Sequence, residues 1–354
     1  MSADIVIFIR SLNVGGAERQ SIYLTKELSK RYNVILIVLN KEGGFVEEVE
    51  QSLENVLFLK GNMFSKIYQL YIFLKRNKTQ FLFNYLPVNN ILGGVIGKLA
   101  GVEYIFNGIR GNKIHNNILK MKLQRFVSNR IVYKTISNSH KAKEVYVKYG
   151  FKAEKIIVIH NMTTYEPKEI QVSSKADVIQ LLTVGRFVEE KGYDTLLLAL
   201  HSLLNRTSKK WQLTIIGYGV LQNKILQMIE ELELTNYIKI VSESSKLVKY
   251  YNESDIYIST SRFEGMSNTI MEAMSHGLPV ICTKAGDSDQ LVTNEVNGMI
   301  CEIDNHQNIA NQILRLIESD KERYSYGIES LNKIKQSFTP ESISIEYIKL
   351  IEAK

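Results

Sequence analysis

Two carboxylates in the segment SRFEGMSNTIMEA (261–273) are spaced so that they could hold one ligand. Glu264 follows a β-branched run and is expected in a strand-end loop, whereas Glu272 is expected about two turns into a helix that begins near Ser267, a favourable N-cap residue. A carboxylate can accept two hydrogen bonds from a vicinal diol, which sugars and ribose both present. Backbone N–H groups at the helix start favour a phosphate between the two acids. The segment therefore predicts contacts to sugar, diphosphate and ribose in that order, and two unrelated surface glutamates are the alternative.

Two cations follow another predicted strand. Arg186 and Lys191 come directly after the run that ends at Gly185. Such cations at the carboxyl end of a strand suit a diphosphate, because arginine can bind two oxygens at once and lysine adds a point charge. A pair of solvated surface charges remains the alternative interpretation.

Glycine turns link strands to the elements that follow them in each half of the chain. Gly15 and Gly16 precede a predicted helix, and Gly217 and Gly219 end the run IIGYG. Glycine allows a tight turn or a close approach to a ligand, and the helix start beyond Gly16 could bind phosphate. Neither sequence has the glycine spacing of a dinucleotide site, so a nicotinamide-dependent dehydrogenase is not supported, and a plain strand–helix turn is the alternative.

Short apolar runs alternate with helical patterns along the whole chain, which is typical of parallel strands in βαβ units. The expected strands of the first half are 4–9, 33–39, 80–86, 102–107, 133–139 and 155–160, and those of the second half are 178–185, 211–217, 237–241, 255–260, 278–283 and 297–303. Two consecutive open α/β sheets follow from this pattern. Ligands of such sheets bind at the carboxyl ends of the strands.

The alternation is interrupted once, by a polar stretch that contains one of only four prolines. We expect a first domain over 1–161, a linker over 162–177, a second domain over 178–336 and a separate capped helix within 337–354. That final helix could pack across both domains.

The composition is that of a soluble globular protein, with 354 residues, 45% hydrophobic residues and 23% charged residues. No stretch approaches the ~20 apolar residues of a membrane span, and the first apolar run is too short for a signal peptide. Cys282 and Cys301 are expected to be buried free thiols in a cytosolic protein. The charge is uneven, since residues 1–160 carry a formal +13 and the remainder −6.

These motifs resemble the retaining glycosyltransferases of family 4. The resemblance covers nearly the whole chain and rests on GGAERQ (15–20), VGRFVEEKGYDTLLLAL (184–200), IIGYG (215–219), SRFEGMSNTIMEAMSHGLPVICT (261–283) and NGMI (297–300). It implies the GT-B fold, in which two Rossmann-like α/β/α domains face each other across a cleft. It also implies transfer from a nucleotide sugar with retention of anomeric configuration and without a metal ion or other cofactor. The sequence agrees with the last point, because it lacks a His/Cys ligand set.

The resemblance also implies roles for individual residues. Arg186 and Lys191 would bind the donor diphosphate and stabilise the leaving nucleotide, Glu264 would contact the donor sugar, and Glu272 would hold the ribose hydroxyls. The glycine turns of both domains would lie close to the donor. Further donor contacts would come from the helix start, at Met266, Ser267, Asn268 and Thr269.

The sequence departs from the family in two places. Many members carry a histidine near the sugar, where this chain has a loop containing Asn107, Arg110 and Asn112, and its nearest histidine is His115. Arg110 could face a phosphate of the donor or acceptor, or it could be structural. Gln290 stands where many members have a third acid, and we assign it no role.

Two basic, partly apolar segments, 63–78 and 113–134, are expected to lie on anionic lipid at the inner face of the membrane, or else to be core-facing helices with solvated outer faces. Nucleic acid is a weaker interpretation, because no recognition module accompanies the charge. The hypothesis is a glycosyltransferase that moves a sugar from a UDP-linked donor onto a lipid-linked glycan of a bacterial surface polysaccharide. A nucleotide-sugar epimerase of the same fold and a non-catalytic nucleotide-sugar-binding protein are the alternatives.

Overall fold

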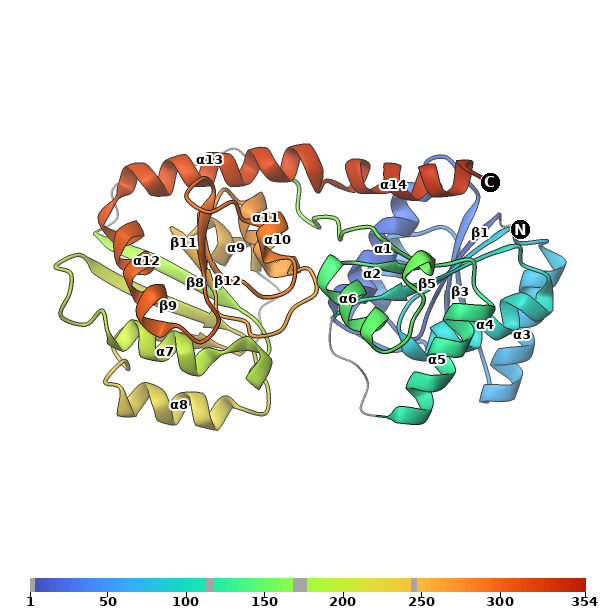
Figure 1. The fold of residues 1–354 in the computed structure, drawn as a ribbon, viewed down its shortest axis with the longest axis horizontal. Helices are drawn as coiled ribbons and strands as arrows, with labels where there is room; N and C mark the ends of the chain where they lie inside the picture. The colour runs from blue at the N-terminus through green and yellow to red at the C-terminus, as the bar shows by residue number, and fades with distance from the viewer. Residues whose placement is uncertain (1–3, 112–116, 168–176, 243–246) are drawn as a thin grey trace. The chain divides into compact units, whose positions relative to one another are not determined.

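The computed structural model describes residues 4–111, 117–167, 177–242 and 247–354 and contains two compact units (Figure 1). The first unit comprises Met1–Thr164 together with Thr339–Lys354, and the second comprises Tyr165–Phe338. Each unit is built on one open sheet of parallel strands connected by helices. The predicted fold class, two consecutive α/β sheets, is confirmed.

The sheet of the first unit has seven strands in the order β3-β2-β1-β4-β5-β6-β7, and all its pairings are parallel. Its strands are β1 (Ile5–Ile9), β2 (Val34–Val38), β3 (Val56–Phe58), β4 (Phe81–Asn84), β5 (Tyr104–Ile109), β6 (Lys134–Ser137) and β7 (Ile156–Val158). The strands β1 and β2 are buried throughout because helices cover both faces of a parallel sheet. The sequence did not predict β3, a three-residue edge strand that is only partly buried.

The helices of the first unit fill the connections between these strands. They are α1 (Gly16–Ser29), α2 (Val46–Ser52), α3 (Met63–Arg76), α4 (Pro87–Ala100), α5 (Ile118–Arg130), α6 (His140–Lys148) and the short 3₁₀ helix η1 (Ala153–Lys155). The last helix of the chain, α14 (Pro340–Glu352), packs against α1, and Thr339 caps it by accepting a hydrogen bond from the backbone N–H of Ser342. The predicted capped helix after Pro340 is confirmed, and it belongs to the first unit.

The sheet of the second unit has six parallel strands in the order β10-β9-β8-β11-β12-β13. They are β8 (Val178–Val184), β9 (Lys210–Ile216), β10 (Ile238–Val241), β11 (Ile256–Ser259), β12 (Val280–Thr283) and β13 (Gly298–Cys301). The helices are η2 (Glu189–Lys191), α7 (Tyr193–His201), α8 (Gln222–Glu231), α9 (Leu247–Asn252), α10 (Asn268–Ser275), α11 (Ser288–Leu291), α12 (His306–Glu318) and α13 (Asp320–Ser337). All six strands of this sheet were predicted.

In each sheet, the order in which successive strands are added reverses once. In the second unit the chain runs outward from β8 to β9 and β10, then crosses back so that β11 pairs with the other side of β8. Neighbouring loops at such a switch point diverge to opposite faces and leave a crevice, where ligands of open α/β sheets bind. The loops that follow β8 and β11 carry Lys191 and Glu264, respectively.

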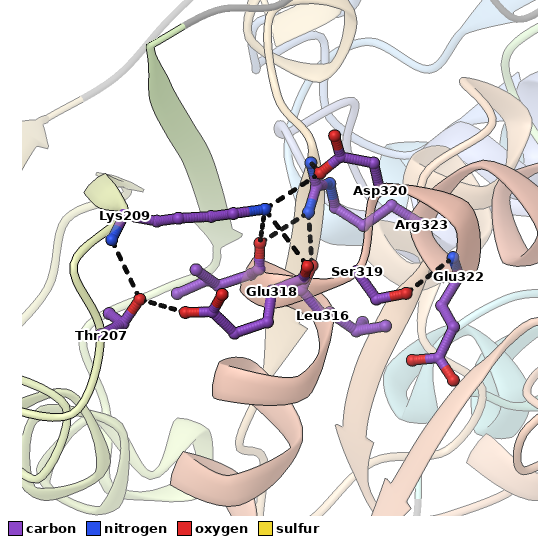
Figure 2. Close-up of polar contacts among 9 residues, drawn as sticks. Thr207, Lys209, Leu316, Glu318, Ser319, Asp320, Glu322 and Arg323 are labelled. Carbon is purple, nitrogen blue, oxygen red and sulfur yellow. Dashed lines mark hydrogen bonds and ion pairs between the residues drawn. The ribbon is translucent and has the colours of Figure 1, made fainter.

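A polar network fixes the corner between α12 and α13 (Figure 2). Lys209 and Arg323 donate hydrogen bonds to the last carbonyls of α12, and both also contact Asp320. Ser319 caps the following helix by accepting from the backbone N–H of Glu322. Cations suit the negative end of a helix, so the network stabilises the corner.

Other expectations can be compared with the described residues. Both cysteines are buried free thiols, as predicted. Residues 168–176 of the expected linker lie outside the described residues. Among the described residues, no helix combines the length and the apolar character that a membrane span requires.

Candidate functional site

The centre of the candidate site is an ion pair between the loops that follow β8 and β11. The Nζ atom of Lys191 lies 2.5 Å from Oε1 of Glu264, and the same oxygen accepts a hydrogen bond from the Ser261 hydroxyl at 2.9 Å. The two charged side chains are only 20% and 17% exposed, so solvent screens their attraction incompletely. An ammonium and a carboxylate thus share one partly shielded spot at the switch point of the sheet.

Arg186 lies in the same strand-end loop as Lys191 and is exposed. No hydrogen bond or ion pair links its guanidinium to another residue within the described ranges. Beside it, the Tyr193 hydroxyl donates to the carbonyl of Gly185 at 2.7 Å, and burial, with the nearby Glu264 charge, raises the pKa of Tyr193. Tyr193 therefore fixes the start of the loop by a hydrogen bond, while the exposed Arg186 can contact a ligand.

Glycines let the loops after β8 and β9 approach each other. A Cβ on Gly217 would collide with the carbonyl oxygen of Gly185. A Cβ on Gly219, whose φ is +156°, would lie 2.6 Å from the carbonyl oxygen of Phe187. The glycine turn that the sequence assigned to the donor thus packs against the Arg186–Lys191 loop, which gives Gly217 and Gly219 a role in shaping the site.

Glu272 is the fifth residue of α10, so it lies in the second turn, nearer the helix start than the two turns predicted. Its side chain is buried, and its Oε2 accepts a hydrogen bond from the Tyr251 hydroxyl at 2.9 Å. Burial and the adjacent carboxylate raise the pKa of Tyr251, which keeps the phenol protonated as a donor. The interpretation of Glu272 as an unrelated surface glutamate is wrong.

The helix α10 begins where the sequence predicted, with Ser267 as the N-cap residue. The Ser267 side chain does not accept the capping hydrogen bond, and its hydroxyl lies 3.2 Å from that of Thr269. Met266 and Ser267 are buried, while Asn268 and Thr269 are partly exposed. Gln290, to which no role was assigned, is exposed on α11.

In the first unit, the diglycine turn has a feature that the sequence did not reveal. Gly15 is the N-cap of α1 in an extended conformation and Gly16 is the first helical residue. The carboxylate of Glu18 folds back over Gly15, where a Cβ would collide with it. Burial raises the pKa of Glu18, although a hydrogen bond from its own backbone N–H acts to lower it. A side-chain carboxyl therefore occupies the helix start that the sequence offered to a phosphate.

Asn107 and Arg110 do not form the predicted loop together. Asn107 lies inside β5, is 1% exposed and pairs with Asn84 at 3.0 Å, so its placement in a loop is wrong.

Arg110 follows the strand, and its guanidinium donates to Asn161 at 3.0 Å and to the Tyr347 hydroxyl of α14 at 3.2 Å. It also lies over the ring of Tyr85. These contacts favour the structural interpretation of Arg110. Asn112 and His115 lie outside the described residues.

Sequence reasoning missed three side chains: Glu18 at the start of α1 in the first unit, and Tyr251 and Arg262 beside the candidate site of the second unit. The first lies within the quoted GGAERQ motif and could have been noticed there as an acid three residues after a glycine N-cap. The other two act through contacts with residues distant in sequence, which no local pattern indicates.

Comparison with known proteins gives a family match that lies within the second unit. Residues 166–332 match the family described as glycosyl transferases group 1. An uncharacterized glycosyltransferase of Haemophilus influenzae is 28% identical over 355 residues, which cover 92% of this chain and 97% of that protein. A Campylobacter jejuni N-acetylgalactosamine-N,N'-diacetylbacillosaminyl-diphospho-undecaprenol 4-alpha-N-acetylgalactosaminyltransferase is 25% identical and matches 93% of this chain and 94% of its own.

Solved structures share the fold across both units. The Anabaena HepE protein in complex with UDP and glucose aligns with a TM-score of 0.86 at 20% identity, over 99% of this chain and 100% of that one. Staphylococcus aureus TarM aligns with a TM-score of 0.80 at 14% identity, over 99% of each chain. The expected fold, two Rossmann-like domains of the GT-B type, is confirmed.

Proposed function

We propose that this chain, a glycosyltransferase that uses a nucleotide sugar and whose residues 166–332 match the glycosyl transferases group 1, transfers the sugar of a UDP-linked donor, with retained anomeric configuration, to a lipid-linked glycan acceptor. The second unit binds the donor and the first unit supplies the acceptor side. The product is part of a bacterial surface polysaccharide. Its expected setting is the cytoplasmic face of the inner membrane, without a metal ion.

The observation that carries the proposal is the Lys191–Glu264 pair at the switch point of the second sheet. An ammonium suits the diphosphate of a nucleotide sugar, and a carboxylate suits the hydroxyls of the sugar attached to it. The two charged groups are in direct contact, at 2.5 Å, so they can bind adjacent parts of one ligand. Arg186 adds a second, exposed cation to the same loop.

The proposed chemistry divides among these side chains. The bond between the anomeric carbon and the diphosphate oxygen breaks, and the acceptor hydroxyl forms its bond from the same face while its proton passes to the departing diphosphate. Negative charge therefore accumulates on the leaving group, where Arg186 and Lys191 stabilise it. Glu264 holds the sugar hydroxyls, and Glu272 holds the ribose hydroxyls.

Two kinds of similarity support the choice of donor and acceptor. UDP is bound in solved structures of the Anabaena HepE protein, one of which also contains glucose. The name of the Campylobacter relative specifies a diphospho-undecaprenol acceptor, and a relative from Erwinia amylovora is named for amylovoran biosynthesis. These printed activities belong to those proteins and guide the proposal for this chain.

A surface of the first unit supports docking to anionic lipid. The helices α3, α4 and α5 pack side by side (Figure 1), and none of the three contains an acidic residue. We call the following exposed side chains the apolar–basic surface: Phe64, Tyr68, Lys75 and Arg76 of α3, Lys98 and Leu99 of α4, and Leu119, Lys120, Lys122, Leu123, Phe126 and Arg130 of α5.

The apolar members of this surface form stripes. Phe64 and Tyr68 are 83% and 65% exposed one helical turn apart, and Leu119, Leu123 and Phe126 repeat the spacing along α5. Exposed apolar side chains flanked by lysine and arginine match the chemistry of an acidic lipid surface, to which each cation contributes ~1 kcal/mol. Segment 63–78 and the described part of segment 113–134, residues 117–134, thus present outer faces that are apolar as well as charged, and α4 joins them.

Vesicle flotation tests the docking. The protein should float with vesicles that contain phosphatidylserine, remain at the bottom with phosphatidylcholine alone, and detach as salt is raised. The double variant Leu119→Asp/Phe126→Asp should not float. Leu226→Asp provides the control, because Leu226 is 43% exposed on α8 of the second unit. Flotation of the double variant as well as the control would remove α5 from the contact.

A donor panel tests the transfer. The protein is incubated with UDP-, GDP- and dTDP-sugars with and without a bacterial lipid extract, and the released nucleotide is measured. Lipid-dependent release from a UDP-sugar supports the proposal. Conversion of the sugar nucleotide into an epimer indicates an epimerase, and unchanged donors in every mixture contradict catalysis.

A further inference from the structure

Arg262 lies two residues before Glu264, in a part of the sequence motif to which no role has been attached. Its side chain is 20% exposed and makes contacts in three directions. The Nε atom donates to Asp304 at 2.7 Å and Nη2 donates to Asp194 at 2.8 Å. The Nη1 atom donates to the backbone carbonyl of Glu189 at 3.0 Å.

Two of these contacts are made to residues on either side of Lys191 in the sequence. Glu189 precedes that lysine in η2, while Asp194 follows it in the first turn of α7. Burial acts to raise the pKa of Asp194, but the hydrogen bond and charge of Arg262, together with hydrogen bonds from the backbone N–H groups of Thr195 and Asp194, outweigh it and leave that pKa below its usual value. The hydrogen bond with Asp194 is also the main reason that the pKa of Arg262 is raised. The charged state of both groups is therefore favoured.

The backbone of the same segment completes the attachment. The backbone N–H of Arg262 donates to the carbonyl of Glu190 at 2.8 Å. The Thr260 hydroxyl lies 3.1 Å from the carbonyl oxygen of Lys191 and 3.0 Å from that of Gly192. Arg262 thus binds the carbonyls of Glu189 and Glu190, and the single hydroxyl hydrogen of Thr260 faces the next two carbonyls, those of Lys191 and Gly192. Gly192, with φ +62°, allows this approach, because a Cβ there would collide with the Thr260 carbonyl.

We propose that Arg262 is a positioning residue that sets the distance between the donor-binding groups Lys191 and Glu264. This inference rests on the proposed function, since it assigns the two groups to one ligand. A planar guanidinium suits the task because its donors diverge in fixed directions toward three acceptors. A lysine at this position would satisfy one or two of them and leave the loops less firmly joined.

A mutant cycle tests the proposal with a readout that a general loss of stability would not give. We expect Arg262→Gln to lower kcat by ~10-fold to 100-fold, since small misplacements of reacting groups cost that much. Arg262→Lys should retain intermediate activity. Because Arg262 acts through Lys191, Arg262→Gln should change kcat by less than ~3-fold when Lys191 is already alanine, as expected for coupled sites.

The control is Arg315→Gln. Arg315 is also forked, between Glu322 and Glu295, but those contacts lie on α12, α13 and the loop before β13. Its loss should lower thermal stability and leave kcat unchanged. The same cycle read by calorimetry with UDP should show that Arg262→Gln weakens UDP binding only where Lys191 is present.

The outcomes separate the inference from the function it rests on. If the wild-type protein transfers sugar but the losses from Arg262→Gln and Lys191→Ala multiply, Arg262 acts independently and the inference is wrong. A folded Arg262→Lys variant with wild-type kcat and UDP affinity would also overturn it. If the wild-type protein transfers no sugar from any donor, the proposed function itself fails.

Discussion

Lys191 and Glu264 are 73 residues apart in the sequence, yet their charged atoms lie 2.5 Å from each other. Their loops follow β8 and β11, which are neighbours in the sheet. The pairing places a cation and an anion at the point where the strand order reverses. The proposed binding of the donor depends on this pair of side chains more than on any single residue.

Replacement of Lys191 by alanine should slow transfer more than it weakens sugar binding. Removing a group that stabilises charge on the leaving diphosphate costs ~10²-fold to 10³-fold in kcat. Steady-state kinetics on the preferred donor measure kcat and KM separately. Lys249→Ala is the control, because Lys249 is a 62% exposed lysine paired only loosely with Glu253. A normal kcat for Lys191→Ala would refute its role at the leaving group.

Glu272→Gln should weaken nucleotide binding while the protein stays folded. A charged hydrogen-bond partner contributes about 1.5–3 kcal/mol, so the dissociation constant for UDP should rise by ~10-fold to 150-fold. Isothermal calorimetry measures the change. Tyr251→Phe removes one hydrogen bond to this carboxylate, and we expect a smaller loss. Unchanged UDP affinity in the glutamine variant would remove Glu272 from the site.

Gly217→Ala should disturb the site through the backbone. The added methyl group would collide with the carbonyl of Gly185, so the loops after β8 and β9 must separate. We expect a loss of stability of about 1–3 kcal/mol, typical of steric overpacking, together with weaker UDP binding. Gly101→Asn serves as the control, because Gly101 has φ +85° and open space around its Cα. Chemical denaturation measures the stability, and calorimetry measures the UDP affinity. If both values are unchanged in Gly217→Ala, the close approach of the two loops does not shape the site.

The free energy of unfolding should fall as the pH rises above 9, in part because of Cys282. Burial raises the pKa of this thiol from 9.0 to about 12. Between those values the unfolded state loses the proton while the folded state keeps it, so the stabilising contribution is complete below pH 9 and declines toward pH 12. From pH 9 to 10 the loss should be of order 1 kcal/mol.

Urea denaturation of the wild-type protein and of Cys282→Ala at pH 8, 9 and 10 isolates this effect. The alanine variant lacks the thiol, so the difference in stability between the two proteins should narrow as the pH rises. A difference that stays constant over this range would show that Cys282 does not ionise more readily on unfolding.

The sequence predicted the parts of the fold that depend on local pattern. Apolar runs bounded by turn residues located six strands of the second sheet, and the N-cap preference of serine located the start of α10 at Ser267. The strand β3 escaped because three partly buried residues at an edge carry almost no periodic signal. The position of Glu264 in a loop after β11 also followed from local reasoning.

Tertiary partners decided what the sequence could not predict. Arg110 turns toward Tyr347, which is 237 residues away, so its direction depends on where the last helix packs. Glu272 is buried against Tyr251, and Arg262 contacts Asp194 in the first turn of α7 and Asp304 in the loop after β13. Each of these contacts requires the fold to exist before the partner can be identified. The exposure of apolar side chains on α3 and α5 likewise depends on which helix faces pack against the sheet.

The most direct test of the central claim is the NMR spectrum of the product formed from the preferred UDP-sugar and the lipid-linked acceptor. The account predicts that the acceptor gains one sugar per UDP released and that the anomeric configuration of the new linkage matches that of the donor. Inversion at the anomeric carbon, or release of free sugar in place of transfer, would contradict it.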